Sequence, residues 1–457
     1  MEMLLSDCAA CVQGRLVGKD LAISSVSIDT RTIKPGQLYV AIKGHNFDGN
    51  DFIAQAEQAG AVAAIVHNGV AAAIPHIVVD DTRLALAELA GAWRKKAAVS
   101  VVGITGSNGK TTVKEMVAAI LSASDSKQSN VLYTQGNLNN DIGVPLTLLR
   151  LNEQHQYAVI EMGANHPGEI AYTSTCAQAD VVIITNAGAA HIEGFGNLDG
   201  VAEAKGEIIQ TLKQDGVAVI NRDDKYFDYW KTIAGNRRTL SFGLNETADV
   251  TAKDIATEIR DNAFATTFKL VTAQGTVESV LRLAGRHNVV NALAATAACL
   301  ALDISLQQIK QGLESVQPVT GRMQPLVSRL GNIVIDDTYN ANAASLKAGL
   351  DVLATCAGKP WLVLGAFGEL GPESPKMHEE IGELIKASGV TRLLAVGADS
   401  KNTAQAFGTG ATFFATQQDL IAALKQELKG DETILIKGSR AQRMENVVAA
   451  LVDNFRN

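Results

Sequence analysis

Several residue types that mark particular protein classes are scarce in this sequence. Only 5% of the 457 residues are aromatic, and nine prolines stand against forty glycines. The most apolar stretch, residues 289–302, is too short to cross a bilayer and contains Asn291. We therefore expect no membrane insertion and interpret this stretch as a buried helix. The composition favours many short α/β connections over an aromatic-rich recognition surface.

Cysteine is also rare, and its five positions are scattered. Cys8 and Cys11 form a C-x-x-C pair, but no second pair is present to complete a zinc site. On a helix the two thiols share one face, so packing as small apolar side chains is the favoured interpretation. Residues 1–5 lack the basic and apolar regions of a secretory signal. Together with the odd cysteine count, this predicts a protein of the reducing cytoplasm.

Positive charge is not in excess either. The formal net charge is −8, which disfavours non-specific binding of nucleic acid or of an anionic membrane and still permits a local basic pocket for phosphates. With 47% hydrophobic and 19% charged residues, the composition is that of a soluble globular protein. A chain of this length exceeds what one hydrophobic core usually organises, so we expect about two to four domains.

The pattern of expected strands and helices changes twice along the chain, which predicts three domains. Residues 1–84 combine short strands with one helix near 52–59 and indicate a small α/β domain. From 85 to 317, apolar strands alternate with helices, as in a parallel sheet covered on both faces. Within it, residues 237–283 alternate in Thr and Val and predict inserted antiparallel strands. Residues 318–457 repeat the α/β alternation on a smaller scale.

The predicted fold class is therefore α/β with three domains: a central P-loop-type parallel-sheet domain, a small N-terminal α/β domain and a Rossmann-like C-terminal domain. Clefts between such domains, outside the carboxyl ends of strands, are where ligands bind. The strands are predicted at residues 26–28, 38–42, 63–66, 76–79, 99–105, 157–161, 181–185, 217–220, 333–336, 361–365, 393–396 and 433–437, with helices at 84–96 and 110–122.

The strongest chemical motif is I-T-G-S-N-G-K-T-T at 104–112, between a predicted strand and a predicted helix. Backbone N–H groups of such a loop, with the N-terminus of the following helix, cradle phosphate oxygens. Lys110 can then reach the β- and γ-phosphates, and the Thr111 hydroxyl can bind Mg²⁺. The strict pattern requires glycine where Ile104 stands, with Gly103 one place early, so a plain glycine-rich turn is the alternative. The strand–loop–helix context favours a nucleoside triphosphate site.

Two further residues, Glu161 and His191, are candidates by position. Glu161 ends a predicted strand and can point at a metal beside the phosphates; the alternative is a surface glutamate at a strand end. His191 follows another strand at the same edge, where a functional role is favoured over a structural one. The pattern around Lys205, V-A-E-A-K-G-E-I-I, is by itself that of an ordinary exposed helical lysine.

The phosphate loop is one of several motifs that occur in a fixed order. The others are T-Q-G-N-L-N-N-D-I-G-V-P-L-T-L-L (134–149), E-M-G-A-N (161–165), H-I-E-G-F-G (191–196), G-R-H-N-V-V-N-A (285–292), G-R-M (321–323) and D-D-T-Y-N-A-N (336–342). In this order the chain resembles the Mur ligases, the ATP-dependent amide-forming enzymes of peptidoglycan precursor synthesis. The resemblance runs essentially end to end and is far more specific than the loop alone.

Other segments resemble one member of that family, the one that joins D-alanyl-D-alanine to UDP-N-acetylmuramoyl-tripeptide. They are D-T-R-T-I-K-P-G-Q-L-Y-V-A-I-K-G (29–44), F-D-G-N-D-F (47–52), E-L-G (369–371) followed by His378, and K-G-S-R (437–440). The D-N-P-R segment of the ligase that adds diaminopimelate or lysine is absent from the sequence. The resemblance implies amide formation through an acyl phosphate with ATP and Mg²⁺. We expect a monomer whose first domain binds the UDP-sugar and whose third closes on ATP and binds the dipeptide.

The resemblance also implies roles for individual residues. Catalysis would involve Lys110, Glu161, His191, Lys205 and Arg322, with Thr111, Glu161 and His191 as metal ligands. Lys205 matches a lysine that is carbamylated in related ligases, which would turn it into a carboxylate-like ligand. The nucleotide would contact Thr105, Gly106, Ser107, Asn108, Gly109, Lys110, Thr111, Thr112, Asn288, Asn291, Arg322 and Asp337. The other substrate would contact Ser25, Arg31, Lys43, Asp48, Gly49 and Asn140.

The sequence departs from the family pattern at three places. Asn50 stands where histidine is frequent, Ala343 replaces a frequent proline, and Gly365-Ala366-Phe367 replaces G-D-M near the expected dipeptide site. Two alternative enzyme hypotheses are another Mur ligase and a folylpolyglutamate-type ligase. The folylpolyglutamate-type ligase lacks this kind of N-terminal domain. A rival of another class is a nucleotide switch or transport ATPase, which would hydrolyse ATP without forming an amide.

Overall fold

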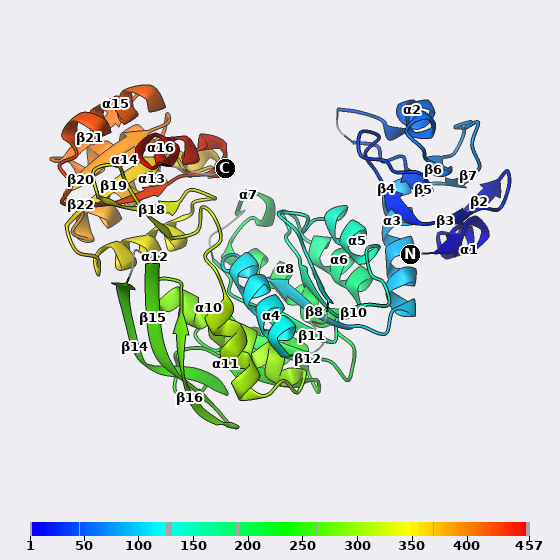
Figure 1. The fold of residues 1–457 in the computed structure, drawn as a ribbon, viewed down its shortest axis with the longest axis horizontal. Helices are drawn as coiled ribbons and strands as arrows, with labels where there is room; N and C mark the ends of the chain where they lie inside the picture. The colour runs from blue at the N-terminus through cyan, green and yellow to red at the C-terminus, as the bar shows by residue number, and fades with distance from the viewer. Residues whose placement is uncertain are drawn as a thin grey trace.

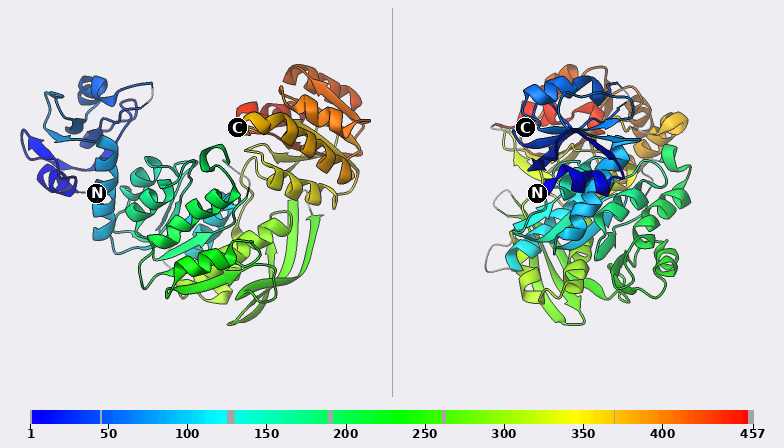
Figure 2. Two further views of the ribbon diagram at one scale, coloured as in Figure 1. Left: turned by 180° about the vertical axis from the view of Figure 1, so that it is seen from behind. Right: turned by 90° about the vertical axis from the view of Figure 1, so that its right-hand side faces the viewer.

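Three α/β units follow one another along the chain (Figure 1). The computed structural model describes residues 2–44, 46–124, 130–188, 192–260, 263–368 and 370–453. The N-terminal and C-terminal units lie at opposite ends of the long axis, and the central unit lies between them (Figures 1 and 2). The predicted α/β fold class is confirmed. None of the described helices is long and apolar enough to cross a membrane.

The first unit is built on a five-stranded sheet in the order β2-β7-β6-β5-β4, parallel except for β2. All four strands expected there are present. The short β1, β2 and β3 and helix α1 were not predicted, because two- and three-residue strands carry no readable alternation. The elements are β1 (Met3–Leu4), α1 (Leu5–Cys11), β2 (Arg15–Val17), β3 (Ala22–Ile23), β4 (Ser25–Ser27), β5 (Gln37–Val40), η1 (Gly49–Phe52), α2 (Ile53–Gln58), β6 (Ala63–His67) and β7 (His76–Val79).

The C-x-x-C pair lies on α1 and packs into the core of this unit. Cys8 is fully buried, both thiols are free, and burial raises the pKa of the Cys8 thiol to about 12. A thiol with such a pKa stays protonated at neutral pH and makes a poor metal ligand or nucleophile. The packing interpretation of the pair is therefore confirmed.

The central unit contains a nine-stranded sheet in the order β16-β15-β14-β13-β12-β11-β8-β10-β9. Its elements are α3 (Thr82–Lys96), β8 (Ser100–Thr105), α4 (Lys110–Ser124), β9 (Asn130–Tyr133), α5 (Gly143–Leu148), β10 (His155–Glu161), α6 (Glu169–Ala177), β11 (Val181–Ile184), α7 (Ile192–Phe195), α8 (Leu198–Gln210), β12 (Val217–Asn221), α9 (Phe227–Ala234), β13 (Arg238–Phe242), β14 (Val250–Arg260), β15 (Ala263–Thr272), β16 (Gly275–Leu281), α10 (Arg286–Ala301) and α11 (Leu306–Ser315).

Helices cover both faces of this sheet, as the apolar strands predict. Helices α4, α10 and α11 pack together on one face, whereas α6 and α8 belong to the core on the other. The interpretation of residues 289–302 as a buried helix is confirmed by α10. The expectation for residues 237–283 is partly wrong: β13 runs parallel to β12, and the antiparallel ladder begins only with β14 and β15.

The position of β8 decides where a ligand can bind. Chain connections run from β8 outward to β9 and back to β10 on one side, then cross to β11 on the other. The strand order therefore reverses beside β8, and the carboxyl ends of β10, β8 and β11 lie next to one another. Such a reversal opens a crevice at the carboxyl edge of the sheet. Glu161, which ends β10, pairs in register with Ile104 of β8.

The third unit has a six-stranded sheet in the order β17-β18-β22-β19-β20-β21, parallel except for β17. The four inner strands, β18, β22, β19 and β20, were predicted, whereas the edge strands β17 and β21 were not. The elements are β17 (Gln324–Val327), β18 (Ile333–Asp337), α12 (Ala343–Leu353), β19 (Lys359–Gly365), η2 (Gly371–Glu373), α13 (Ser374–Ala387), β20 (Arg392–Val396), α14 (Ser400–Phe407), β21 (Ala411–Phe414), α15 (Gln417–Glu427), β22 (Glu432–Lys437), η3 (Arg440–Gln442) and α16 (Glu445–Leu451).

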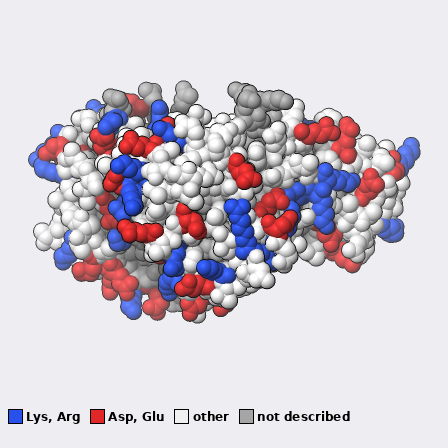
Figure 3. All heavy atoms as spheres, turned by 90° about the horizontal axis from the view of Figure 1, so that it is seen from below, with Lys and Arg blue, Asp and Glu red and all other residues white. Residues whose placement is uncertain are grey.

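Acidic and basic side chains are interspersed on the surface shown in Figure 3. Neither sign of charge forms an extended face in that view. This distribution agrees with the modest negative net charge.

The close packing of α11 on α4 yields a stability prediction. A Cβ added at Gly312 of α11 would lie 2.3 Å from the Ile120 Cα of α4, so we expect Gly312→Ala to lower the free energy of unfolding by about 1–3 kcal/mol. Gly91 of α3 is the matched control, because its added Cβ would have no neighbour closer than 3.6 Å. Gly91→Ala should be neutral or stabilising by up to about 1 kcal/mol. Denaturant unfolding followed by circular dichroism measures both, and equal stabilities would contradict the packing argument.

Candidate functional site

Two adjoining cavities lie where the central sheet meets the C-terminal unit. The α10 cavity, of about 460 Å³, is lined by residues of α10 and of the segment before β17. The β10 cavity, of about 380 Å³, is lined by Glu161 and by the loops after β10 and β18. Both border Asn108, Gly109, Arg322 and Asp337. Each is of a size that suits a small ligand, and the glycine-rich loop runs between them.

The loop owes its path to two glycines. A Cβ at Gly106 would lie 1.9 Å from the Thr185 Oγ1 atom, and a Cβ at Gly109 would lie 2.4 Å from the Asn291 Oδ1 atom. Both residues also have a positive φ, +141° and +84°, which favours glycine. Ile104, where the strict pattern requires glycine, is a buried residue inside β8. The tight part of the loop therefore starts at Gly106, and glycine is not needed earlier.

Polar side chains after β11 hold the loop in place. Ser107 N–H donates to the Asn186 backbone oxygen at 3.0 Å, and Asn108 N–H donates to the Asn186 Oδ1 atom at 3.0 Å. The Thr185 hydroxyl donates to the Asn108 backbone oxygen at 2.6 Å. The loop is thus fixed before any ligand arrives, which lowers the entropic cost of binding.

Lys110 begins α4 and stays close to the loop. Its ammonium donates to the Gly106 backbone oxygen at 2.7 Å. Burial lowers the pKa of Lys110, attraction from Glu161 raises it, and repulsion from Arg322 lowers it further. The ammonium is therefore enclosed with too little negative charge around it, a situation that a bound phosphate would relieve.

Glu161 lines the β10 cavity, and one of its carboxylate oxygens has no hydrogen-bond partner among the described residues. Asn139 Nδ2 donates to the Oε1 atom at 2.8 Å, and the backbone N–H of Glu161 donates to the Thr134 hydroxyl at 3.0 Å. The Oε2 atom is buried and has no hydrogen-bond partner in the described part of the chain. Only 2% of Glu161 is exposed, so the alternative of a surface glutamate is wrong. An orphaned buried carboxylate oxygen needs a cation or a donor.

Lys205 on α8 is also buried, with 2% exposure, which corrects the interpretation of this residue as an ordinary exposed lysine. Burial lowers the pKa of Lys205 to about 7, and repulsion from Lys110 lowers it in the same direction. Its ammonium lies 5.3 Å from the centre of the Phe195 ring. The pattern failed here because Phe195 of α7 lies against this lysine, a contact that periodicity does not reveal.

The C-terminal unit reaches the loop with two side chains. Arg322 Nη2 donates to the Thr111 hydroxyl at 3.1 Å, and Asn342 Nδ2 donates to the Asn108 Oδ1 atom at 2.7 Å. The guanidinium carbon of Arg322 lies 4.2 Å from the centre of the Tyr339 ring. The structure therefore brings Arg322 to the end of the loop that starts α4.

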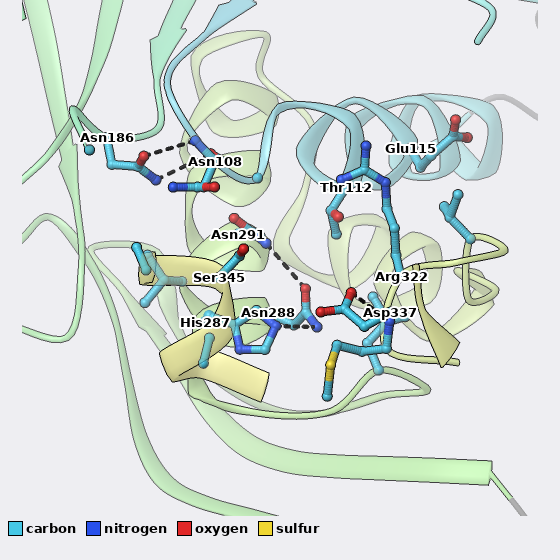
Figure 4. Close-up of a pocket in the computed structure, with 18 of the residues that line it drawn as sticks. Asn108, Thr112, Glu115, Asn186, His287, Asn288, Asn291, Arg322, Asp337 and Ser345 are labelled. Carbon is cyan, nitrogen blue, oxygen red and sulfur yellow. Dashed lines mark hydrogen bonds between the residues drawn. The ribbon is translucent and has the colours of Figure 1, made fainter. Parts of the chain in front are cut away.

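The α10 cavity gathers amide and carboxylate groups (Figure 4). Asn288 and Asn291, one turn apart on α10, are linked by a hydrogen bond from Nδ2 of Asn291 to Oδ1 of Asn288 at 3.1 Å. Asp337 accepts from Met323 N–H at 3.2 Å and from the Lys437 ammonium at 2.5 Å. Thr112 also lines this cavity. Donors and acceptors at this spacing suit a base and a sugar next to the phosphate loop.

Other predicted residues have different positions. Thr105 is fully buried and its hydroxyl donates to the Met162 backbone oxygen at 2.9 Å, so its role is to anchor the loop. Asn140 lines the β10 cavity and accepts from Gly143 N–H at 2.8 Å. His191 lies outside the described residues. The predicted substrate-binding residues of the N-terminal unit border neither cavity; they are Ser25, Arg31, Lys43, Asp48 and Gly49.

Within the N-terminal unit these residues form small polar clusters of their own. Arg31 is exposed and pairs with Asp29 at 2.7 Å, which holds the pKa of that carboxyl at about 2. Lys43 lies 4.0 Å from Asp48, whose carboxylate also caps Gly49–Phe52 by accepting from Asn50 N–H. The cationic side chains at the surface agree with a site for a phosphorylated substrate, and their roles stay predictions.

Three polar residues of the site were not assigned from the sequence. Lys437 ends β22 and pairs with Asp337, Asn139 orients Glu161, and Asn342 contacts the loop. Lys437 could have been found, because it ends a predicted parallel strand at the same edge as Asp337. Asn139 and Asn342 lie in loops, where the sequence pattern gives no direction to a side chain.

Comparison with known families and structures agrees with this geometry. The Mur ligase middle domain model matches residues 104–299, the model named Mur ligase, glutamate ligase domain, matches 321–440, and the Mur ligase family, catalytic domain model matches 22–94. The three matches together cover most of the chain.

Individual relatives match over nearly the whole length. The UDP-N-acetylmuramoyl-tripeptide–D-alanyl-D-alanine ligase of Escherichia coli (strain K12) is 44% identical over 99% of both chains. A crystal structure of MurF from Acinetobacter baumannii is 37% identical, with a TM-score of 0.91 over 98% of both chains. MurF from Thermotoga maritima, solved in complex with ADP, is 28% identical, with a TM-score of 0.83 over 93% of this chain and 96% of that one. The chain therefore belongs to the Mur ligase family.

Proposed function

We propose that the protein is an ATP-dependent ligase that joins D-alanyl-D-alanine to the peptide carboxylate of UDP-N-acetylmuramoyl-tripeptide in peptidoglycan precursor synthesis. The observation that carries this proposal is the match, over 99% of both chains, to a ligase named for these substrates. The geometry supports the ATP half of the reaction, because Lys110 and Arg322 place positive charge at a pre-formed phosphate loop.

The first step is phosphoryl transfer. A carboxylate oxygen of the tripeptide attacks the γ-phosphorus of ATP, ADP leaves, and an acyl phosphate forms. Both reactants are anionic, so the barrier is largely electrostatic repulsion. Lys110 and Arg322 supply fixed positive charge where the transferring group passes, and a buried site makes that charge more effective than it would be in water.

The second step forms the amide. The amine of D-alanyl-D-alanine attacks the acyl carbon, a tetrahedral intermediate forms, and phosphate leaves as the nitrogen loses its proton. We assign residues 1–84 to UDP-sugar binding, 85–317 to ATP binding and 318–457 to closure on ATP and dipeptide binding. Gly365-Ala366-Phe367 replaces G-D-M, and Ala366 and Phe367 are buried with 6% and 5% exposure, so position 366 offers no carboxylate to the dipeptide.

The site fits Mg²⁺. Glu161 Oε2 is a buried oxygen without a partner among the described residues, and Thr111 lines the same β10 cavity. No group of three or more His, Cys, Asp or Glu side chains that could hold a metal occurs among the described residues. Mg²⁺ needs no such group, because it is commonly held by one or two carboxylates, phosphate oxygens and water. Thr111, Glu161 and His191 would hold the ion, which would neutralise phosphate charge.

The proposal places the protein in the cytoplasm as a monomer. The rival ligases differ in the amino acid added or the acceptor, and the rival ATPase forms no amide. We expect phosphate release from ATP with UDP-N-acetylmuramoyl-tripeptide only when D-alanyl-D-alanine is present, with a product whose mass shows one added dipeptide. Release with a different amino acid would overturn the substrate assignment, and release without any amide would favour the ATPase.

The lowered pKa of Lys205 predicts carbamylation above neutral pH. A neutral amine is needed to attack carbon dioxide, and the N–C bond forms as the nitrogen releases a proton. With a pKa of about 7, the neutral fraction rises from roughly a tenth at pH 6 to roughly nine-tenths at pH 8. Carbon-13 NMR of protein in labelled bicarbonate should show a carbamate signal that grows over this range and is lost in Lys205→Arg. The same signal in Lys205→Arg would place the modification elsewhere.

The orphaned oxygen of Glu161 predicts how nucleotide binding depends on Mg²⁺. Glu161→Gln should reduce the Mg²⁺-dependent gain in ADP affinity by about tenfold or more, since even groups that only hydrogen-bond to a metal's ligands contribute that much. Glu169→Gln is the matched control, because Glu169 lines the same cavity and both its oxygens have partners, Asn165 N–H and His166 Nδ1. Calorimetric titration with and without Mg²⁺ measures the gain. Equal losses in the two variants would contradict the assignment.

A further inference from the structure

Arg322 lies on a short segment whose backbone is tightly constrained. The segment joins α11 to β17, and the residues on either side of Arg322 have positive φ, +74° at Gly321 and +50° at Met323. A residue other than glycine in the left-handed region is uncommon and needs support from its surroundings. The chain accepts this conformation at Met323, which fixes the direction in which the Arg322 side chain leaves the backbone.

The support comes from the end of β18. The backbone N–H of Tyr339 donates to the Gly321 backbone oxygen at 3.0 Å, and Met323 N–H donates to the Asp337 Oδ1 atom at 3.2 Å. A Cβ at Gly321 would lie 3.2 Å from the Tyr339 nitrogen, closer than most side chains tolerate. The two segments are therefore in direct contact on both sides of Arg322.

The guanidinium itself has few partners. Its Nη2 atom donates to the Thr111 hydroxyl at 3.1 Å, and its Nε atom is buried with no hydrogen bond in the part of the chain that the structure describes. One hydrogen bond at the end of a long side chain leaves the plane of the guanidinium free to rotate. The guanidinium also contacts the Tyr339 ring, whose centre is 4.2 Å from the guanidinium carbon.

An aromatic ring can orient the Arg322 guanidinium without using its hydrogen-bond donors, which a carboxylate cannot do. Contact with an aromatic face restricts the guanidinium plane and leaves the N–H donors at its edge unused. A carboxylate would orient the group equally well, but it would occupy two donors and cancel the charge. Tyr339 is 36% exposed and borders the β10 cavity, which Arg322 also lines. A ligand in this cavity can therefore reach the free donors of the Arg322 guanidinium beside the Tyr339 ring.

We propose that Tyr339 is a positioning residue that orients the Arg322 guanidinium toward the terminal phosphate of the nucleotide. This inference rests on the proposed function, in which ATP occupies the loop and Arg322 acts on its transferring group. Tyr339 acts through Arg322 and through the face of its ring, so neither the phenol hydroxyl nor direct contact with the nucleotide is required.

The experiment compares Tyr339→Leu with Tyr339→Phe in the full-length protein. Loss of the ring should weaken binding of a non-hydrolysable ATP analogue and lower kcat/KM for ATP by about three- to thirtyfold, the range of a cation–π contact, whereas Phe should restore most of the loss. Affinity for ADP should change by less than about twofold in either variant, because ADP has no terminal phosphate for Arg322. Intact ADP binding also shows that the variants are folded.

A double-mutant cycle then tests whether Tyr339 works through Arg322. In the Arg322→Ala background, Tyr339→Leu should add less than about a twofold loss. An equal loss in both backgrounds, a loss of ADP and ATP-analogue binding to the same degree, or a failure of Phe to restore function would each overturn the inference. The binding arms need no ligase product. Failure of the wild-type protein to form the amide would therefore overturn the proposed function. The role of Tyr339 would still be decided by the ratio of ATP-analogue affinity to ADP affinity in each variant.

Discussion

Excess positive charge enclosed at the carboxyl end of β8 is the constraint on which the rest of the site depends. Burial and repulsion from Arg322 lower the pKa of Lys110, and burial and repulsion from Lys110 lower the pKa of Lys205 to about 7. Among the described residues, the carboxylate that opposes them, Glu161, has one oxygen without a partner. Enclosing unpaired charge is costly, and a protein that keeps such an arrangement uses it to bind ions of opposite sign.

The parallel sheet makes this concentration of charge possible. Every strand of the central unit from β9 to β14 in the sheet order runs in the same direction, so the loops that follow them meet at one edge. The reversal of strand order beside β8 leaves space between those loops, and two glycines let the phosphate loop approach β11 and α10 closely. The loop can therefore be rigid and still expose its N–H groups, which preorganises the site for phosphate.

Charge from a second unit completes the arrangement. Arg322 and Asn342 contact the loop from the C-terminal side, and Asp337 is held by Lys437 at the end of the neighbouring strand β22. These polar contacts join the C-terminal unit to the phosphate loop, and apolar contacts join the two units as well, because Phe264 and Ala284 of the central unit pack into the hydrophobic core of the C-terminal unit.

The motif at 104–112, the parallel strands around it and the place of Glu161 were readable from the sequence, because short-range patterns of glycine and apolar residues determine them. The burial of Lys205, the orphaned oxygen of Glu161 and the stacking of Tyr339 on Arg322 were not. Lys205 has the local pattern of an exposed lysine, and Tyr339 and Arg322 lie on separate segments that meet only in the folded chain. Local sequence sets the conformation of a segment, whereas burial, pKa and contact between distant residues arise only when the packed units surround a side chain.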